Sequence, residues 1–384
     1  MHKGNGNNSV VTLISREDKG YMRRGQYLNL IRMDNTNEIS ESVIGFDALY
    51  ESMSRCRKGV IWKDSAARYC LNAIEETIKL EDQLKGGTYR AKEPIRFKVT
   101  HPKERDITSI AFRDRVYQRS LNDNVIYPAM VKSFIPDNFA CQKGKGTDGA
   151  RERLKAFLRQ EYRKNGTEFY VLQMDIKGYY KNMRHDKAFE LFKKKLDPES
   201  YERAVAVLSE QYAGSKGFDP GSQMVQIAGI SFLDGLDHYI KERLRIKHYI
   251  RYMDDLILLH PSPDYLAYCK EQISGKLKDI GLEMHPQKSR IYPISEGIKF
   301  LGFIFRISAI GKVTMMLKPG NVKAERKKLR RLVNMVKAGR ITKSKADECY
   351  RGWRAHALKG DSAKLLITMD EYYKDLWRYN NGNT

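Results

Sequence analysis

The chain has 384 residues, of which 41% are hydrophobic and 10% aromatic, and 70 Lys and Arg against 47 Asp and Glu give it a formal net charge of +23. This apolar content excludes a disordered chain and is enough for two or three subdomains with hydrophobic cores. The basic excess favours an anionic polymer as partner, nucleic acid before membrane, although a basic protein without such a partner would carry the same charge.

The five cysteines are scattered without C-x-x-C spacing, which predicts neither a zinc site nor a disulfide framework and fits a reducing cytoplasm. No run approaches the roughly 20 apolar residues of a membrane span, and the N-terminus lacks the apolar core of a signal peptide. We therefore expect a cytoplasmic protein, not bound to a membrane, that begins with an N-terminal tail at residues 1–40.

In the first third of the chain the sequence predicts helices on either side of one short strand. Helices are expected over residues 44–84, where apolar positions recur at mostly helical spacing: Ala66, Leu71, Ile74, Ile78 and Leu84. Alternating apolar and basic residues predict a strand over Ile95–Val99. A further helix is expected over residues 112–126, ending before Pro128.

A Gly-Lys-Gly loop at residues 139–147 precedes a basic helix. Backbone amides and the ammonium groups of Lys143 and Lys145 in such a loop can bind a triphosphate. The loop lacks the spacing of a Walker motif, and most loops of this composition are ordinary turns.

Two segments that resemble strands end in carboxylates. A mostly apolar run ends at Asp175, and residues 249–259 carry Asp254 and Asp255 between two apolar runs, which predicts a hairpin with both aspartates at its turn. If the strands are neighbours, Asp175 and Asp254 face one another across about 5 Å. Such carboxylates repel one another unless cations neutralise them, and they suit two magnesium ions about 4 Å apart that serve phosphoryl transfer. A solvated turn is the ordinary alternative, and the apolar flanks argue against it.

Helices, a strand and a hairpin are expected in the remaining central region. The sequence predicts a helix of about two dozen residues from Gly221 and a second helix over residues 264–277. A turn is then followed by a strand that carries Lys288, and residues 298–303 form a tight apolar hairpin.

The C-terminal part of the chain is strongly basic. Between Lys318 and Lys345 there are 11 Lys or Arg and one acidic residue, Glu325. A stripe at i, i+3, i+4 and i+7 gives the predicted helix an apolar face, made of Leu329, Leu332, Val333 and Val336. A solvated charged helix is the ordinary outcome, and the one-sided charge favours a nucleic-acid groove instead.

Tyr252-Met253-Asp254-Asp255, with Asp-Ile-Lys-Gly-Tyr-Tyr at residues 175–180 upstream, resembles the palm of a reverse transcriptase. The bacterial enzymes of the retron, diversity-generating retroelement and group II intron type are the most similar, and the motifs occur in the family's order from about Phe46 to about Leu366.

The resemblance implies an α+β right-hand polymerase fold. It places fingers at residues 41–170, a palm with an antiparallel sheet packed on helices at 171–305, and a basic helical thumb at 306–384.

The implied activity is RNA-directed DNA synthesis, in which dNTPs extend a primer 3′-hydroxyl. Asp175, Asp254 and the backbone carbonyl of Ile176 would hold two Mg²⁺ ions, for which Mn²⁺ can substitute, and Asp255 would support them. Lys288 would protonate the leaving pyrophosphate, and a plain surface cation is an equal alternative for it.

The resemblance also assigns residues to the nucleotide. Lys143, Lys145 and Arg105 are candidates to bind its phosphates. Tyr180 is the candidate ring that excludes a ribose 2′-hydroxyl, and Gln226 is a candidate contact to the template base or the nucleotide.

Tyr179 is expected to pack into the palm. Two positions depart from the family pattern: Gln142 stands where Arg is frequent, and Val225 stands where the gene-diversifying enzymes have Ser.

The implied partners are an RNA template, a DNA or RNA primer, dNTPs and a dedicated structured RNA, together with a small accessory protein or a second copy of the chain. Retron DNA synthesis, gene diversification and antiviral defence remain open as biological roles. Three other functions also remain open: RNA-directed RNA synthesis, against which Tyr180 argues, untemplated or protein-primed DNA synthesis, and an RNA-binding scaffold similar to a maturase. Three intact carboxylates argue against the scaffold.

Overall fold

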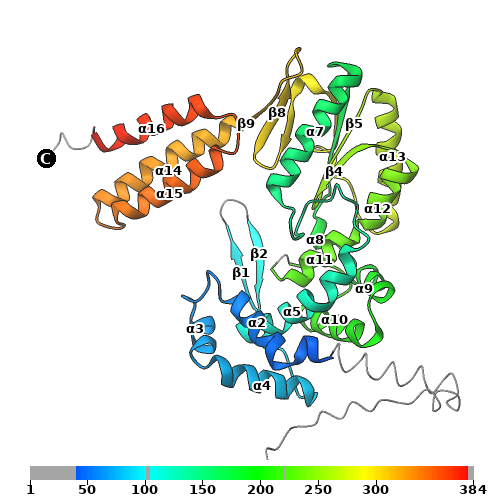
Figure 1. Ribbon diagram of the computed structural model, residues 1–384, viewed down its shortest axis with the longest axis vertical. Coiled ribbons are helices and arrows are strands. Elements are labelled where there is room, and N and C mark those ends of the chain that lie inside the picture. The colour runs from blue at the N-terminus through cyan, green and yellow to red at the C-terminus, as the bar shows by residue number, and fades with distance from the viewer. Residues whose placement is uncertain (1–39, 101–103, 220, 379–384) are drawn as a thin grey trace, which may run out of the picture. The chain divides into compact units, whose positions relative to one another are not determined.

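The computed structural model describes residues 40–100, 104–219 and 221–378 (Figure 1). The predicted N-terminal tail lies outside these residues except for Ser40, as do the last six residues of the predicted thumb. The described chain divides into two compact units. Unit 1 contains the residues up to Ala129 with Lys195–Ala213 and Ser222–Met224, and unit 2 contains the remainder.

Unit 1 consists of helices and one antiparallel hairpin. Its elements are α2 (Phe46–Cys56), α3 (Asp64–Leu71), α4 (Ala73–Lys85), β1 (Ile95–Val99), β2 (Arg105–Ser109), α5 (Phe112–Leu121), the π-helical turn η2 (Asn122–Ile126) and α10 (Pro198–Gln211). The predicted strand at Ile95–Val99 is therefore present and pairs with β2. The helices pack around fully buried side chains, among them Leu49, Met53, Leu80, Val116 and Leu121.

Two predictions in unit 1 are wrong in detail. Ile74 and Ile78 are exposed, because α4 turns a different face, that of Thr77, Leu80 and Leu84, toward the core. Leu71, the last residue of α3, is exposed as well. The helix also does not end before Pro128. It continues through η2 into α6 (Tyr127–Val131). Proline has no backbone N–H to donate, and the π-helical turn accommodates the missing hydrogen bond.

Unit 2 contains two antiparallel sheets. The first has the strand order β4 (His248–Tyr252), β5 (Asp255–His260), β3 (Tyr170–Asp175), β6 (Arg290–Pro293), and the second has the order β7 (Ile298–Phe300), β8 (Phe303–Ile307), β9 (Val313–Leu317). Helices α7 (Thr147–Asn165), α8 (Tyr179–Asn182), α9 (His185–Lys195), α11 (Gln223–Phe232), α12 (Asp234–His238) and α13 (Pro263–Asp279) accompany them. The predicted hairpins at 249–259 and 298–303 are both present.

The C-terminal helices of unit 2 have a core of their own. They are α14 (Pro319–Lys337), α15 (Lys343–Ala357) and α16 (Ala363–Arg378), which lie side by side in Figure 1. The predicted apolar stripe of α14 packs against α15 and α16: Leu329, Leu332 and Val333 are buried there with Tyr350 and Met369. The apolar face of this helix was thus predicted correctly, and its basic residues are left for the opposite face.

Two further predictions differ from the structure. The long helix expected from Gly221 begins at Gln223 and is broken at Leu233, so that α12 and the π-helical turn η3 (Tyr239–Arg243) follow as separate pieces. Lys288 lies in a turn, and β6 begins only at Arg290, because the preceding segment bonds back to the end of β3. Within the described residues, no helix is long and apolar enough to span a membrane.

Candidate active site

The three predicted carboxylates lie at one end of the four-stranded sheet. Asp175 is the last residue of β3 and is the direct cross-strand partner of Asp255, the first residue of β5. Met253 and Asp254 form the turn between β4 and β5. The expectation that Asp175 would face Asp254 across the ladder is wrong in register, because the two-residue turn takes Asp254 out of the ladder and leaves Asp255 opposite Asp175.

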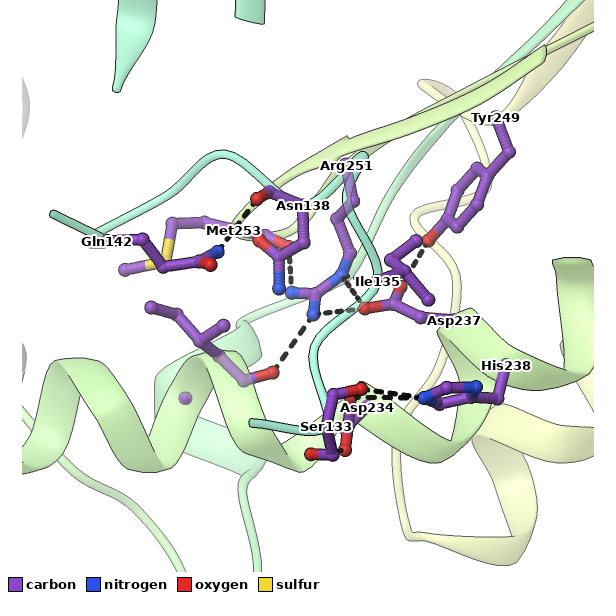
Figure 2. Close-up of polar contacts among 12 residues, drawn as sticks. Ser133, Ile135, Asn138, Gln142, Asp234, Asp237, His238, Tyr249, Arg251 and Met253 are labelled. Carbon is purple, nitrogen blue, oxygen red and sulfur yellow. Dashed lines mark hydrogen bonds and ion pairs between the residues drawn. The ribbon is translucent and has the colours of Figure 1, made fainter. Parts of the chain in front are cut away.

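The backbone of this turn is strained, and a buried arginine donates a hydrogen bond to it. Met253 has φ +57°, a left-handed conformation that costs a non-glycine residue on the order of 1–2 kcal/mol. Arg251 Nη1 donates a hydrogen bond of 3.0 Å to the Met253 carbonyl (Figure 2). Because this carbonyl precedes Asp254, the guanidinium fixes the backbone that carries the carboxylate.

Arg251 is fully buried and belongs to a closed polar network. Its Nε and Nη2 donate to the Asp237 carboxylate at 2.6–3.0 Å (Figure 2). Nη2 also donates to the Ile230 carbonyl at 3.0 Å. The Tyr249 hydroxyl donates a further bond of 2.6 Å to Asp237. A buried ion pair is tolerated only when its remaining donors and acceptors are satisfied, and here they link α11, α12 and β4 beneath the turn.

The carboxylates disfavour their own ionisation. Burial raises the pKa of Asp254, and the charge of Asp175 raises it further. Burial raises the pKa of Asp255 to about 6, with Asp254 and then Asp175 as additional causes, while Lys318 and Lys288 oppose the shift. The negative charge of the three carboxylates is thus not fully balanced by nearby cationic side chains. A hard divalent cation, which prefers oxygen ligands, would reduce the repulsion among them.

The donor chemistry of this cluster fits magnesium, but the side chains are not assembled as a cage. In the described part of the chain, no three His, Cys, Asp or Glu side chains are grouped so that they could hold a metal ion. Instead, Lys288 Nζ lies 2.5 Å from Asp175 Oδ2, and this hydrogen bond raises the pKa of Lys288. The lysine supplies one positive charge where a cation would otherwise be needed.

Backbone bonds attach the Lys288 turn to the end of β3. The His285 amide donates to the Asp175 carbonyl at 2.7 Å, and the Lys177 amide donates to the Glu283 carbonyl at 2.9 Å. The carbonyl of Ile176 lies between these two bonds and takes part in neither. The structure thus places Lys288 and the Ile176 backbone beside Asp175.

The two tyrosines after Asp175 have different surroundings. Tyr179 is buried, as expected, and its hydroxyl donates to the Gly229 carbonyl. The Tyr180 hydroxyl lies 3.9 Å from Met253 Sδ, next to the carboxylate turn. A Cβ atom at Gly229 would approach the Tyr180 hydroxyl to 2.8 Å, so the absence of a side chain on α11 creates the room for this ring.

Lys145 is used by its own loop. Its ammonium donates to the carbonyls of Ile135, Pro136 and Asn138 at 3.4, 3.0 and 2.7 Å, and burial lowers its pKa. The same segment lies along β4: the Phe139 amide donates to the Arg251 carbonyl at 3.1 Å. The Lys145 ammonium therefore stabilises the conformation of the predicted triphosphate loop by bonding to its backbone carbonyls.

The remaining candidates belong to different parts of the chain. Lys143 lies in the same loop as Lys145, and Gln226 is a half-exposed residue of α11 in unit 2. Arg105 is the first residue of β2 and belongs to unit 1. Asp175, Asp254, Asp255, Lys288, Ile176 and Tyr180 are thus gathered around one turn.

Sequence reasoning missed three basic residues. Arg251 had a recognisable signal, because a charged residue inside an apolar strand requires a buried partner. Arg151 had no such signal in the sequence. It is buried in α7 and donates a hydrogen bond of 2.9 Å to the carbonyl of Leu301 in the apolar hairpin, where Leu301 has a φ of +44°. Lys318, the residue before α14, opposes the raised pKa of Asp255, a role visible only once the chain is folded.

Residues 98–305, more than half of the chain, match the family described as reverse transcriptase (RNA-dependent DNA polymerase). The chain belongs to this family. The α+β right-hand polymerase fold that the resemblance implied is thereby confirmed, as is the resemblance itself at the level of the family.

Solved structures of telomerase are similar to this chain. Apo telomerase from Candida tropicalis has 13% identity and a TM-score of 0.44 over 59% of this chain and 49% of that chain. Telomerase from Candida albicans in complex with a telomeric RNA fragment has 10% identity and a TM-score of 0.46 over 75% and 55%. The chain thus spans about half the length of these two relatives. No curated protein matched the sequence.

Proposed function

We propose that this chain is an RNA-directed DNA polymerase that extends a primer 3′-hydroxyl with dNTPs. The observation that carries the proposal is the meeting of Asp175, Asp254 and Asp255 at one sheet end, where burial and mutual repulsion raise the pKa of Asp254 and Asp255. Carboxylates arranged at such a cost are well suited to a site whose chemistry consists of binding cations and phosphates. Family membership supports the same reaction.

Asp175, Asp254 and the carbonyl of Ile176 would hold two Mg²⁺ ions, or Mn²⁺ in their place, with Asp255 in support. Bound there, the ions would supply a lowered pKa for the primer hydroxyl and neutralisation of the triphosphate. Arg251 would keep the Asp254 backbone in position through its bond to the Met253 carbonyl.

Lys288 would act as the acid for the leaving group. As the primer 3′-oxygen bonds to the α-phosphorus and the bond from that phosphorus to the bridging oxygen breaks, the Lys288 ammonium would donate a proton to the departing pyrophosphate oxygen. Its position beside Asp175, on an exposed turn, supports this role.

Four residues would select and hold the nucleotide. Tyr180 would exclude a ribose 2′-hydroxyl, since its ring lies against Met253 beside the carboxylates. Lys143 and Arg105 would bind the phosphates, and Gln226 would contact the nucleotide or template base. Lys145 would act indirectly, since its ammonium is engaged by loop carbonyls.

The setting we propose is a bacterial or phage retroelement, with synthesis in the cytoplasm. The partners would be an RNA template, a DNA or RNA primer, a dedicated structured RNA, and either a small accessory protein or a second copy of the chain. Diversification, retron synthesis and antiviral defence all fit this biochemistry.

Primer extension tests the proposal. The purified chain, with co-expressed RNA and Mg²⁺, is supplied with dNTPs or rNTPs, with and without an added RNA template and DNA primer, beside Asp254→Asn and the surface control Asp64→Asn. We expect templated DNA from the parent and from Asp64→Asn, and none from Asp254→Asn. Product without template would instead indicate untemplated synthesis. Bound RNA without product from any protein would indicate a scaffold.

A further inference from the structure

An exposed tryptophan lies in the loop of unit 1 that joins α2 to α3. Trp62 is 76% exposed, the highest exposure of any aromatic side chain in the described part of the chain, and its neighbour Ile61 is 54% exposed. Large apolar side chains that protrude together on a surface commonly mark a site of interaction. The proposed polymerase chemistry assigns no role to this loop.

The loop has a defined shape. Its turn requires the left-handed backbone of Gly59, at φ +75°, and the amides of Val60 and Lys63 donate to the carbonyls of Arg57 and Val60 at 3.2 and 2.9 Å. Trp62 Nε1 donates to the Gly59 carbonyl at 3.0 Å, which satisfies the indole N–H and fixes the ring on the turn. The aromatic surface is therefore presented in one orientation, so that a ligand meets a ring that is already ordered.

The loop that carries the ring is cationic. Arg57, Lys58 and Lys63 lie within the loop, and residues 57–63 contain no acidic side chain. Lys63 Nζ lies 5.4 Å from the centre of the Trp62 ring. A ligand that fits this loop thus needs an aromatic or flat apolar face together with negative charge.

A single-stranded nucleic acid combines both properties. Its unpaired bases stack on aromatic side chains, and its phosphates pair with Lys and Arg close by. A double strand offers the phosphates without a free base face. An anionic lipid surface also accepts tryptophan and cations, but the net charge of +23 and membership in an RNA-dependent polymerase family favour nucleic acid.

We propose that the loop Arg57–Lys63 binds a single-stranded stretch of RNA, with one base stacked on Trp62 and the adjacent phosphates near Arg57, Lys58 and Lys63. The choice of RNA over another anion rests on the proposed function. The loop would give the polymerase a second grip on its RNA, one that belongs to unit 1, whereas the catalytic carboxylates belong to unit 2.

Binding of a labelled single-stranded RNA of about 12 nucleotides, close to the size that one such site covers, tests the proposal. The full chain is first saturated with an unlabelled RNA–DNA hybrid, so that the primer–template site is filled. Loss of one stacked base costs roughly 1–3 kcal/mol, so Trp62→Leu is expected to weaken binding about five- to 150-fold. Trp62→Phe, which keeps a ring, is expected to retain most of the affinity.

Two further variants act as controls. Leu71→Ser removes another exposed apolar side chain of unit 1, 82% exposed, and is expected to leave RNA binding unchanged. Replacing Arg57 and Lys58 by Gln is expected to reduce the slope of log affinity against log salt by about 1.4, since each phosphate contact on a single strand contributes about 0.7. A duplex RNA of the same length is expected to show no dependence on Trp62.

Equal affinity of the parent and Trp62→Leu for single-stranded RNA would overturn the proposal. So would a Trp62-dependent affinity for vesicles with anionic lipid and none for RNA. Primer extension by the parent protein separates this outcome from failure of the proposed function. An inactive parent that still binds RNA through Trp62 would refute only the polymerase, and an active parent whose RNA binding does not depend on Trp62 would refute only the loop.

Discussion

Asp255→Asn is expected to stabilise the folded protein at neutral pH while abolishing the proposed activity. Burial, Asp254 and Asp175 raise the pKa of Asp255 from 3.8 to about 6. The folded state therefore binds this proton more tightly than the unfolded chain does, and the ionised carboxylate lowers the free energy of unfolding above about pH 6. Below about pH 4 the group is protonated in both states and the penalty disappears.

The pKa difference limits the size of the effect. A shift of about 2 units at about 1.36 kcal/mol per unit corresponds to at most about 3 kcal/mol. Because Asp255 is only partly shielded from solvent, we expect a gain of about 1–2 kcal/mol in the free energy of unfolding. Asparagine keeps the size of the side chain, so the gain comes from the removed charge.

Urea denaturation of the parent and of Asp255→Asn, repeated between about pH 4 and pH 8, measures this. The gain should be full above about pH 6 and shrink toward zero as the pH falls to about 4. Asp279→Asn is the control, because that side chain is 67% exposed beside Lys276. A gain that is independent of pH, or a loss of stability at pH 8, would refute the idea that repulsion among the carboxylates is stored in the fold.

Three other outcomes are expected. Arg251→Met leaves the buried carboxylate of Asp237 without its partner and should lower the free energy of unfolding by about 3–5 kcal/mol in urea; a loss below about 1 kcal/mol would contradict the role given to this pair. Gly229→Ala should displace the Tyr180 ring and lower kcat/KM for dNTPs about ten- to a hundredfold, whereas Gly235→Ala, with open space around its Cβ, should not; equal effects of the two would rule out the packing argument. Added Mg²⁺ should raise the melting temperature of the parent protein more than that of Asp255→Asn. An equal rise in both proteins would mean that the ion binds elsewhere.

The catalytic segments were predictable because their signals are local. An apolar run that ends in Asp175, and a second run interrupted by Asp254 and Asp255, predict strands and a turn from side-chain alternation and composition alone. The order of these motifs was enough to indicate the family, and the basic and apolar faces of α14 followed from helical spacing. In each case a few neighbouring residues determine the outcome.

The contacts between distant segments depended on the fold. Register placed Asp255 rather than Asp254 opposite Asp175, and packing turned Leu71 toward solvent although its spacing fitted a core position. The ion pair of Arg251 with Asp237 joins residues on two elements whose approach is set by the core. Such pairings depend on cross-strand register and on which helix face the core covers, and these are set by the summed burial of the whole unit rather than by any local pattern.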